Sequence, residues 1–504
     1  MTETAHRPPA VPPPAPDTQP AGSAVLVERL PAYVAERLPM DAAEAFRDLL
    51  GLALLESARP GRRARWSYLT ADPVAVVEAV SDGADPFAAA RRLLDRLDRG
   101  TPADAGLPPF LGGLVGFIGY DVGLAMSPRK TLAVDDQGLP PLRLALHDWV
   151  VAWDRRRGTA WLGGRAVDGD VEALRRRIGR VRERLIDGIV RDRGGATTAA
   201  PDEPLEFVSN LHRTTFEDGV ESVRDAIARG EIYQANLTRR LETPFEGDPW
   251  PLYRRLRTGD PALFSAYLEL GPADLDRGPR GIASASPEPF LAVDARGHVW
   301  TDPIKGTRPR GRDRDEDRAL ARELLASAKD RAENTMIVDV LRNDLGRVCR
   351  PGSVRVPRLC RLERTAAVQH LVSTVTGRLE PGRDAFDLLV ASFPGGSITG
   401  APKLRAMELL EGLETVRRGP YTGALGWIGP DGAMATSILI RTLVADGRRL
   451  SLNVGGGMTW RSDPAAEWDE TVVKARGPLD AIGGREIGGH ELHGRGSGGH
   501  GIAR

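Results

Sequence analysis

The stretch "DRAENTMIVDVLRNDLGR", Asp330 to Arg347, places acidic residues where a buried apolar face is expected. Asp330 and Glu333 stand three residues apart, and apolar residues continue the same spacing one turn later. Because residues three and four apart lie on one side of a helix, both acids share or border its inward face. The stretch therefore predicts a helix that carries carboxylates toward the interior.

A second segment, "DPAAEWDETVVKA" from Asp463 to Ala475, repeats this arrangement. Asp463 and Pro464 open a helix on which Glu467, Glu470 and Lys474 fall on one side. Two acidic pairs on two helices can supply oxygen ligands to a Mg²⁺ ion that keeps waters for a substrate carboxylate. Two surface helices with salt bridges would show the same spacing, so the pattern alone leaves both interpretations open.

Three further polar residues stand among apolar or small neighbours. Glu288 follows a Ser-Pro pair in "GIASASPEPF" and is either a general acid or a turn residue. His370 lies in the strand-like "AVQHLVSTVTG", where a lone histidine is more often a satisfied core residue. Arg441 in "SILIRTL" is expected to be buried in a strand, and it then requires an anionic partner.

Two glycine-rich segments are candidates for ligand contact. "FPGGSITGAPK" offers the Ser397 and Thr399 hydroxyls together with glycine amides that can hold an anion. "LNVGGGMTW" ends a strand in three glycines, which allows a ligand to approach the backbone closely.

The segment "WTDPIKGTRPRG", Trp300 to Gly311, holds a lone lysine, Lys305, between a proline turn and a glycine. A lysine fixed in a turn can act as a nucleophile if its surroundings keep it neutral. A solvated loop lysine is the commoner alternative, since lysine is mostly exposed.

Taken in order along the chain, these segments resemble the chorismate-utilising enzymes, as do "IYQANLTRR" and "PYTGALGW". The resemblance covers about residues 206 to 480, with weaker support upstream from "LLESARPGRRARWSYL" and "GGLVGFIGYD". It implies an α+β fold in which two large antiparallel sheets pack as a sandwich. Helices would lie outside, and the N-terminal region would be intertwined with the catalytic part.

The resemblance also implies a Mg²⁺ cofactor that holds the ring carboxylate of chorismate. Glu333 and Glu470 correspond to direct ligands, and Asp330 and Glu467 would reach the ion through water.

Substrate contacts are implied in the same way. Arg441 and Tyr421 correspond to a clamp on the enolpyruvyl carboxylate, a role suited to a guanidinium fork. Backbone amides near Gly457 and the side chain of Lys474 would complete the anion site.

The remaining roles concern catalysis. His370 matches the active-site histidine of the family, and Glu288 matches the residue that protonates the departing C4 hydroxyl. "PIKGT" resembles the aminodeoxychorismate-forming branch, in which the lysine attacks C2 and ammonia then adds at C4 and expels it. The anthranilate-forming branch usually carries alanine where this chain has Lys305.

Three other residues bear on the identity and the source of the nucleophile. The water-activating lysine of the isochorismate and salicylate formers corresponds to Gln234, which argues against addition of water. Neither Cys349 nor Cys360 lies in a nucleophile-elbow sequence, so ammonia is expected from ammonium or from a separate glutamine amidotransferase subunit.

Two alternatives stay open: an anthranilate-forming enzyme, which differs at Lys305, and a catalytically silent regulatory subunit. Against the second, all four acids, Arg441 and Lys474 are present. The sequence also leaves open whether the product enters folate or another compound built from 4-aminobenzoate. Ser57 in "LLES" resembles a segment that holds tryptophan in these families, and whether tryptophan binds here is equally open.

Composition limits the classes of binding partner and the cellular compartment that we expect for this chain. Lys+Arg and Asp+Glu both number 69, so no global field attracts nucleic acid or anionic lipid. The two cysteines are expected to be free thiols in a reducing cytoplasm. No run approaches the roughly 20 apolar residues of a membrane helix, and the N-terminus lacks the apolar core of a secretory signal.

The 504 residues suggest about three domains or fewer. Composition shifts divide the chain into a disordered proline-rich tail at 1–23, an N-terminal α/β region at 24–193, a linker at 194–205, a catalytic region at 206–482 and a disordered glycine- and histidine-rich tail at 483–504.

Overall fold

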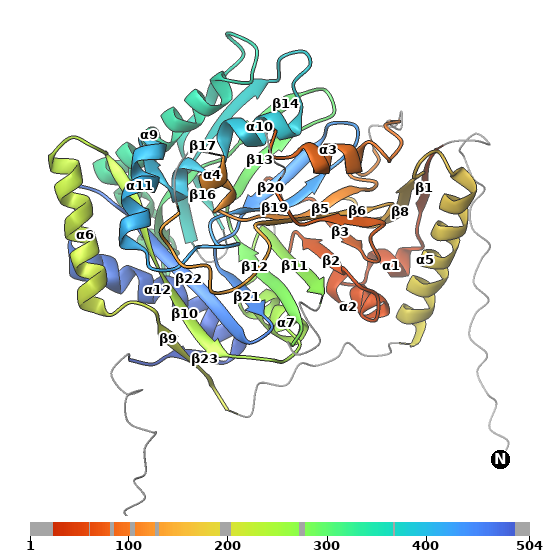
Figure 1. The fold of residues 1–504 in the computed structure, drawn as a ribbon, viewed down its shortest axis with the longest axis horizontal. Coiled ribbons are helices and arrows are strands. Elements are labelled where there is room, and N and C mark those ends of the chain that lie inside the picture. The colour runs from red at the N-terminus through yellow and green to blue at the C-terminus, as the bar shows by residue number, and fades with distance from the viewer. Residues whose placement is uncertain are drawn as a thin grey trace, which may run out of the picture.

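The computed structural model describes residues 24–59, 61–80, 85–100, 106–126, 131–191, 203–271, 278–365 and 368–488. Within these ranges the strands form two large sheets, and most helices lie around them (Figure 1). The expected tail at 1–23, most of the linker and residues 489–504 fall outside the described residues.

The first sheet contains 13 strands in the described part of the chain. Its order is β1 (Val25–Arg29), β8 (Thr159–Arg165), β7 (Trp149–Asp154), β3 (Trp66–Thr70), β2 (Ala53–Glu56), β11 (Phe264–Gly271), β12 (Arg280–Ser286), β21 (Thr442–Asp446), β22 (Arg449–Met458), β10 (Gln234–Pro244), β9 (Leu205–Ser209) and β23 (Gly484–Glu486), with β18 (Gly400–Ala401) also paired to β10.

The second sheet contains 10 strands over the same ranges. Its order is β15 (Ile304–Pro309), β17 (Val368–Arg378), β14 (His298–Thr301), β13 (Pro289–Val293), β20 (Met434–Ile438), β19 (Ala424–Ile428), β5 (Gly113–Ile118), β6 (Leu142–His147) and β4 (Ala75–Val77), with β16 (Arg355–Arg364) also paired to β17.

The helices include two long ones at opposite ends of the molecule, α5 and α6 (Figure 1). In chain order they are α1 (Ala32–Ala35), α2 (Pro39–Ala43), the 3₁₀ turn η1 (Glu44–Phe46), α3 (Ala88–Leu94), α4 (Val122–Ala125), α5 (Val171–Arg191), α6 (Arg213–Ala228), α7 (Trp250–Gly259), α8 (Arg314–Ala326), α9 (Ala328–Gly346), α10 (Ala385–Ser392), the 3₁₀ turn η2 (Gly396–Ile398), α11 (Lys403–Leu413) and α12 (Pro464–Ile482).

The two helices expected to carry acids form where the sequence places them. α9 begins after Ser327, whose hydroxyl accepts a hydrogen bond from the amide of Asp330. α12 begins after Asp463, which accepts from the amide of Ala466, and its first residue is proline. Both starts follow the ordinary rules of helix capping.

The two sheets pack face to face through an apolar layer drawn from both. Tyr68 of the first sheet contacts Phe110 and Trp427 edge-on, with ring centroids 5.5 and 6.0 Å apart. The pairings are antiparallel except that β23 runs parallel to β9. The expected α+β architecture of two packed antiparallel sheets is therefore confirmed.

Strands from the first third of the chain lie inside both sheets. β2 pairs with β11, and β5 pairs with β19 from Ala424↔Ile118 to Ile428↔Leu114. Strands of the region 206–482 thus depend on N-terminal strands for part of their hydrogen bonding.

The expected boundary of the C-terminal tail is wrong. Gly484 to Glu486 form β23, and Arg239 of β10 pairs with Glu486 at 2.6 Å. This pairing satisfies a guanidinium that is only 1% exposed, which explains why order extends past residue 482.

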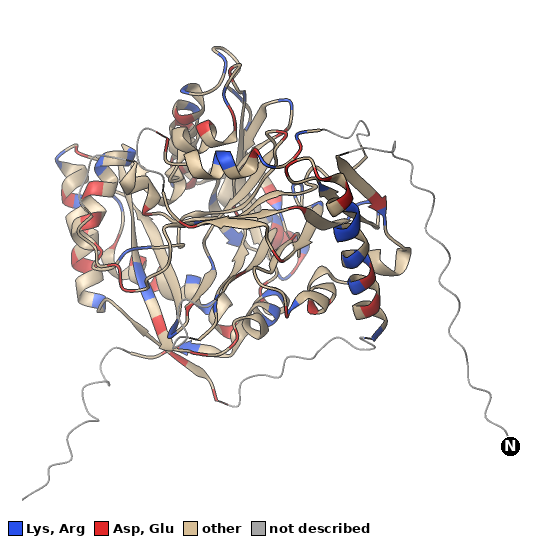
Figure 2. Ribbon diagram, turned by 45° about the vertical axis from the view of Figure 1, so that its right-hand side comes forward, with Lys and Arg blue, Asp and Glu red and all other residues tan. Residues whose placement is uncertain are grey.

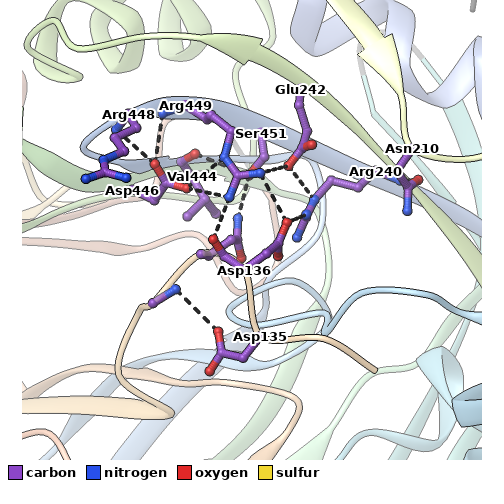
Figure 3. Close-up of polar contacts among 12 residues, drawn as sticks. Asp135, Asp136, Asn210, Arg240, Glu242, Val444, Asp446, Arg448, Arg449 and Ser451 are labelled. Atoms are coloured by element: carbon purple, nitrogen blue, oxygen red, sulfur yellow. Dashed lines mark hydrogen bonds and ion pairs between the residues drawn. The ribbon is translucent and has the colours of Figure 1, made fainter. Parts of the chain in front are cut away.

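A charged cluster fastens an N-terminal loop to β10 and β22 (Figure 3). Asp136 pairs with the buried Arg240 and, at 3.1 Å, with Arg449. Glu242 pairs with the same two arginines at 2.7 and 3.3 Å. Burial would raise the pKa of the Asp136 carboxyl, but the two arginines outweigh it and hold the pKa below its usual value.

Acidic and basic residues alternate along the outer helices, with both signs on α5 and α6 (Figure 2). This distribution matches the zero net charge. None of the described helices is both long and apolar enough to cross a membrane. Cys349 and Cys360 are free and buried.

Candidate active site

Lys305 lies in a strand, and the turn expected around it is absent. It belongs to β15, where Lys305 pairs with Leu371 and Thr307 with His370 of β17, so a bulge falls at Gly306. β15 stands at one end of the sheet order, where Pro309 removes no hydrogen bond from a central ladder.

Gly306 allows helix α9 to approach this strand. Its φ is +76°, and a Cβ here would stand 2.9 Å from the Cβ of Asp330 and 3.0 Å from a methyl carbon of Leu324. A side chain would therefore push the acidic helix away from Lys305.

The Lys305 amine is held beside a buried carboxyl. Its Nζ donates to the carbonyl of Ser397 at 3.3 Å. Glu288 is 8% exposed, and burial raises its pKa, although Lys305 and a hydrogen bond from Ser397 act in the opposite direction. An amine, a carboxyl of raised pKa and the η2 loop thus meet at one point.

Glu333 of α9 lies within electrostatic range of the same amine. Glu333 Oε1 is buried and accepts no hydrogen bond among the described residues, and Lys329 Nζ lies 3.9 Å away. Burial raises the pKa of Glu333, while the charges of Lys305 and Lys329 lower it in part. Asp330 pairs with Arg308 at 3.3 Å.

The carboxylates of α12 complete this group. Glu467 is buried and accepts from the Ser462 hydroxyl at 2.6 Å, and burial raises its pKa against that hydrogen bond. Glu470 pairs with Lys474 at 2.7 Å, and this pairing outweighs burial, so its pKa is lowered. The charge of Glu470 also acts on Glu333, so the two acidic helices share one site.

These four carboxylates suit a hard cation in their chemistry. All donors are oxygens, as Mg²⁺ requires, and the orphaned Glu333 Oε1 is a buried acceptor in need of a partner. Within the described ranges, however, no three His, Cys, Asp or Glu side chains already converge as ligands. Each acid instead contacts its own neighbour: Arg308, Lys329, Ser462 or Lys474.

The expected burial of Arg441 in a strand is wrong. The residue occupies the break between β20 and β21 with φ +50°, and its side chain is 44% exposed. The guanidinium lies 3.8 Å from the Asp260 carboxylate. Its charge also lowers the pKa of His370. The irregular backbone releases the guanidinium from the sheet and leaves it available to an anion.

His370 lies close to this cation, whereas Tyr421 lies in the turn before β19, where its amide donates to the Arg418 carbonyl at 3.1 Å. The Nδ1 atom of His370 is 3.0 Å from the Thr307 hydroxyl, and burial lowers the imidazole pKa to about 4, with Arg441 and Arg59 adding to the effect. Tyr421 is buried, which raises its pKa.

The two glycine-rich segments meet beside β10. Ala401 pairs with Gln234, and Gly457 lies so close that a Cβ there would stand 2.4 Å from Gln234 Nε2. Lys474 Nζ donates to the carbonyl of Gly455 at 2.8 Å. Thr399 is fully buried and its hydroxyl donates to Gly395, so this side chain supports the loop.

Comparison with known proteins agrees with this arrangement. Residues 53–480 match the family described as chorismate binding enzyme. The chain belongs to the chorismate binding enzymes. Anthranilate synthase component 1 of Streptomyces coelicolor is 41% identical over 438 residues, which cover 85% of this chain and 83% of the relative. Aminodeoxychorismate synthase component 1 of Salmonella typhimurium is 39% identical over 391 residues, 77% of this chain and 81% of the relative.

A solved structure gives the same fold for this chorismate binding enzyme. Anthranilate synthase component I from Streptococcus pneumoniae superposes with a TM-score of 0.71 at 30% identity, covering 83% of this chain and 93% of that one. Relatives named for both activities thus stand at similar identity, and family membership alone does not choose between them.

The chorismate binding enzyme also contains a cavity of about 650 Å³ between its sheets. Ser57, Arg63, Tyr68, Trp300 and Trp427 are among its walls, and we refer to it as the Ser57 cavity. The Ser57 hydroxyl donates to the carbonyl of Trp66 at 2.8 Å. The cavity is aromatic with a few polar groups, as small-molecule sites usually are.

Sequence reasoning missed the residues that hold the acids in place. Lys329 stands four residues before Glu333, and Ser462 directly precedes the cap of α12. The spacing of Lys329 was a usable signal, because residues four apart face each other on a helix. The Ser462 contact needed the geometry of the loop itself.

Proposed function

We propose that this enzyme aminates chorismate to 4-amino-4-deoxychorismate through a covalent bond to Lys305. The observation that carries the proposal is the position of Lys305 Nζ, 3.3 Å from the Ser397 carbonyl, in electrostatic contact with Glu288, Glu333 and Glu470. Lys305 is itself half-buried, and a lysine on the open surface would not lie beside Glu288, which is 8% exposed, and Glu333, whose side chain is 19% exposed.

The first step joins the Lys305 amine to C2 of the ring. As the C2–N bond forms, the ring double bonds shift and the C4–O bond breaks. Glu288 supplies the proton that lets the C4 hydroxyl leave as water, a role that its raised pKa supports because more of the acid form is present near neutral pH.

The second step reverses the shift. Ammonia adds at C4, the double bonds return and Lys305 leaves C2 as the free amine, and the new C4 ammonium group returns a proton to the Glu288 carboxylate. The pyruvyl group stays on the ring throughout. Water is disfavoured as the competing nucleophile because Gln234, a neutral amide, stands where water-adding members carry a lysine base.

Substrate carboxylates are held from two directions in this proposal. Arg441 and Tyr421 receive the enolpyruvyl carboxylate, and the amides near Gly457 contribute to the anion site with Lys474. Glu333 and Glu470, with Asp330 and Glu467 behind them, would hold Mg²⁺, which supplies positive charge for the ring carboxylate. Ser397 orients Lys305 through its carbonyl.

A separate glutamine amidotransferase subunit is proposed as the source of ammonia. Two observations support it: several relatives are named as component 1 of a synthase, and neither cysteine is exposed as an amidotransferase nucleophile would have to be. The chain should therefore use ammonium alone, and use glutamine only with that partner present.

Anthranilate formation is the second candidate, favoured by the 41% identity to a relative of that name. Incubation with chorismate, Mg²⁺ and ammonium, followed by chromatography and mass spectrometry, distinguishes the candidates. Aminodeoxychorismate supports the proposal, anthranilate with pyruvate supports the second candidate, and the absence of both rejects them together. Product from glutamine with the purified chain alone would reject the separate partner.

For the Ser57 cavity, the proposed ligand is tryptophan. The volume and the aromatic walls of the cavity suit an indole, and Arg63 offers a cation for the carboxylate of the amino acid. The proposal concerns binding and makes no statement about inhibition.

A further inference from the structure

Arg418 is a buried arginine whose hydrogen bonds are complete. It is 3% exposed and lies after α11, outside the residues assigned to substrate or metal. Its Nε and Nη2 donate to the two oxygens of Glu414 at 2.7 Å each. Nη2 also donates to the Asn236 carbonyl at 2.6 Å, and Nη1 to the Ile398 carbonyl at 2.9 Å and the Thr422 hydroxyl at 3.4 Å. All five N–H donors of the guanidinium are used.

The surroundings keep the guanidinium charged and stack it on an aromatic ring. The guanidinium carbon lies 4.3 Å from the centre of the Tyr120 ring. Burial would lower the pKa of Arg418, but Glu414 outweighs it and the pKa is raised. Glu414 in turn accepts from the amide and hydroxyl of Thr238 on β10, at 3.0 and 2.9 Å.

The two carbonyls that Arg418 holds belong to the candidate active site. Ile398 directly follows Ser397, whose carbonyl accepts from Lys305. Asn236 lies on β10, and its amide donates to the Thr399 carbonyl at 2.8 Å. Arg418 therefore joins the η2 loop to β10 at the point where the loop orients the amine.

A buried ion pair is a costly way to fill an interior, since two ions lose their hydration. An apolar side chain would fill the same volume, but it could not bind two carbonyls of different segments in a fixed plane. The arrangement thus provides directional contacts to the loop beyond its contribution to packing.

We propose that Arg418 is a positioning residue for amination: it fixes the η2 loop against β10, so that the Ser397 carbonyl holds the Lys305 amine in line with the ring. This inference rests on the function proposed above and adds to it a residue that touches neither substrate nor metal. A lysine at this position has three donors that cannot lie in one plane, so it cannot replace the fork.

The test compares R418K with R254K. Arg254 is a matched control: it is 6% exposed, pairs with Asp41 and Glu44 at 2.9 Å, and lies on α7 away from the η2 loop. For R418K we expect kcat to fall about 10- to 100-fold, because a displacement near 1 Å suffices for such losses. Equilibrium binding of chorismate, measured in the Lys305→Ala background so that no covalent adduct forms, should change by less than about threefold. Arg441 and the acids of α9 and α12 lie on other elements, and R418K keeps the backbone hydrogen bond from the Tyr421 amide to the carbonyl of residue 418.

Hydrogen exchange of residues 396–401 provides a readout independent of turnover. R418K should lose protection there, and R254K should keep it, with kcat per folded molecule within about twofold of wild type. A kcat within twofold of wild type for R418K overturns the inference. Equal losses of kcat in both variants at equal loss of thermal stability also overturn it, because the effect would then be one of stability.

If R418K does not fold, the E414Q variant tests the inference in its place. This change leaves the five donors of Arg418 in place but weakens the pair that orients them, so we expect a smaller loss of kcat with increased exchange of the loop. Unchanged kcat and unchanged exchange in E414Q overturn the inference. A wild-type chain that forms no aminated product rejects the proposed function instead, and the exchange comparison then still reports whether Arg418 fixes the loop.

Discussion

Arg63 Nε donates to Asp302 Oδ2 at 2.7 Å, and this pair joins the wall of the Ser57 cavity to the strand that carries Lys305. Asp302 also accepts from Arg62 at 2.7 Å and from the Thr374 hydroxyl at 2.6 Å. It is only 3% exposed and stands three residues before Lys305. The entry to β15 is therefore fixed by charged contacts from the N-terminal region.

Replacing this carboxylate should destabilise the fold. Asp302→Asn removes the charge that two arginines share, and we expect a loss of about 2 kcal/mol in the free energy of unfolding, the scale of hydrogen bonds to charged groups. Urea denaturation measures it. Asp294→Asn is the matched control, because Asp294 lines the same cavity but is more exposed, and its loss should stay below about 0.5 kcal/mol. Equal losses in both variants would contradict the role of Asp302.

Lys305 should carry the ring during turnover. Intact mass of the chain quenched with chorismate and Mg²⁺ in the absence of ammonia should show an added ring, and Lys305→Ala should show none. Lys329→Ala is the control, since Lys329 lies in the same charge cluster but on the helix surface. Equal adducts in wild type and Lys305→Ala would exclude this lysine as the nucleophile.

The acids of α9 and α12 should determine metal binding. Glu333→Gln or Glu470→Gln should lower activity by at least about 100-fold and weaken Mg²⁺ binding measured by calorimetry, because each removes a charged oxygen that a hard cation needs. Asp469→Asn, on the exposed side of α12, should leave both near wild type. Full activity of either glutamine variant at low Mg²⁺ would remove that residue from the site.

His370 should make stability depend on pH in one direction. Burial lowers its pKa from 6.5 to about 4, so between these values the unfolded chain binds the proton more readily. Its contribution is complete above pH 6.5 and is lost as the pH falls toward 4. Wild type should therefore lose more stability than His370→Gln across this interval. Parallel denaturation curves of the two proteins from pH 7 to 4 would contradict the shift.

Tryptophan should stabilise the chain if it occupies the Ser57 cavity. At about 100 times its dissociation constant, a ligand of the folded state adds about 2.7 kcal/mol. Thermal unfolding with and without L-tryptophan measures the shift. Ala295→Trp places a ring at the exposed edge of the cavity and should abolish the shift while leaving unfolding without ligand unchanged. A shift that persists in this variant would place the ligand elsewhere.

Helical positions of the site were predictable from sequence because they depend on local spacing. Glu333 and Glu470 repeat with the apolar faces of their helices, and both helices start at residues that cap well. The family resemblance then joined segments that are distant in the chain. Neither source gave the direction of the backbone between elements.

The predictions that the structure contradicts concern residues at the connections between helices and strands. Arg441 sits among strand-forming residues, yet the chain breaks there with a positive φ, which apolar patterning does not report. Lys305 follows Asp-Pro, a common turn signal, but pairing with β17 holds it in a strand. Arg418 gave no signal, because its partners at Asn236 and Ile398 come from other segments.

The pairing of β5 with β19 has a consequence for synthesis of the chain. Gly113 to Ile118 pair on one edge with the nearby β6, but their other edge pairs with Ala424 to Ile428. That edge of an interior strand therefore stays unpaired until nearly the whole chain has left the ribosome. Contacts of such long sequence separation slow folding and leave strand edges exposed in the meantime. Nascent chains of this enzyme should therefore depend on chaperones that shield unpaired strands.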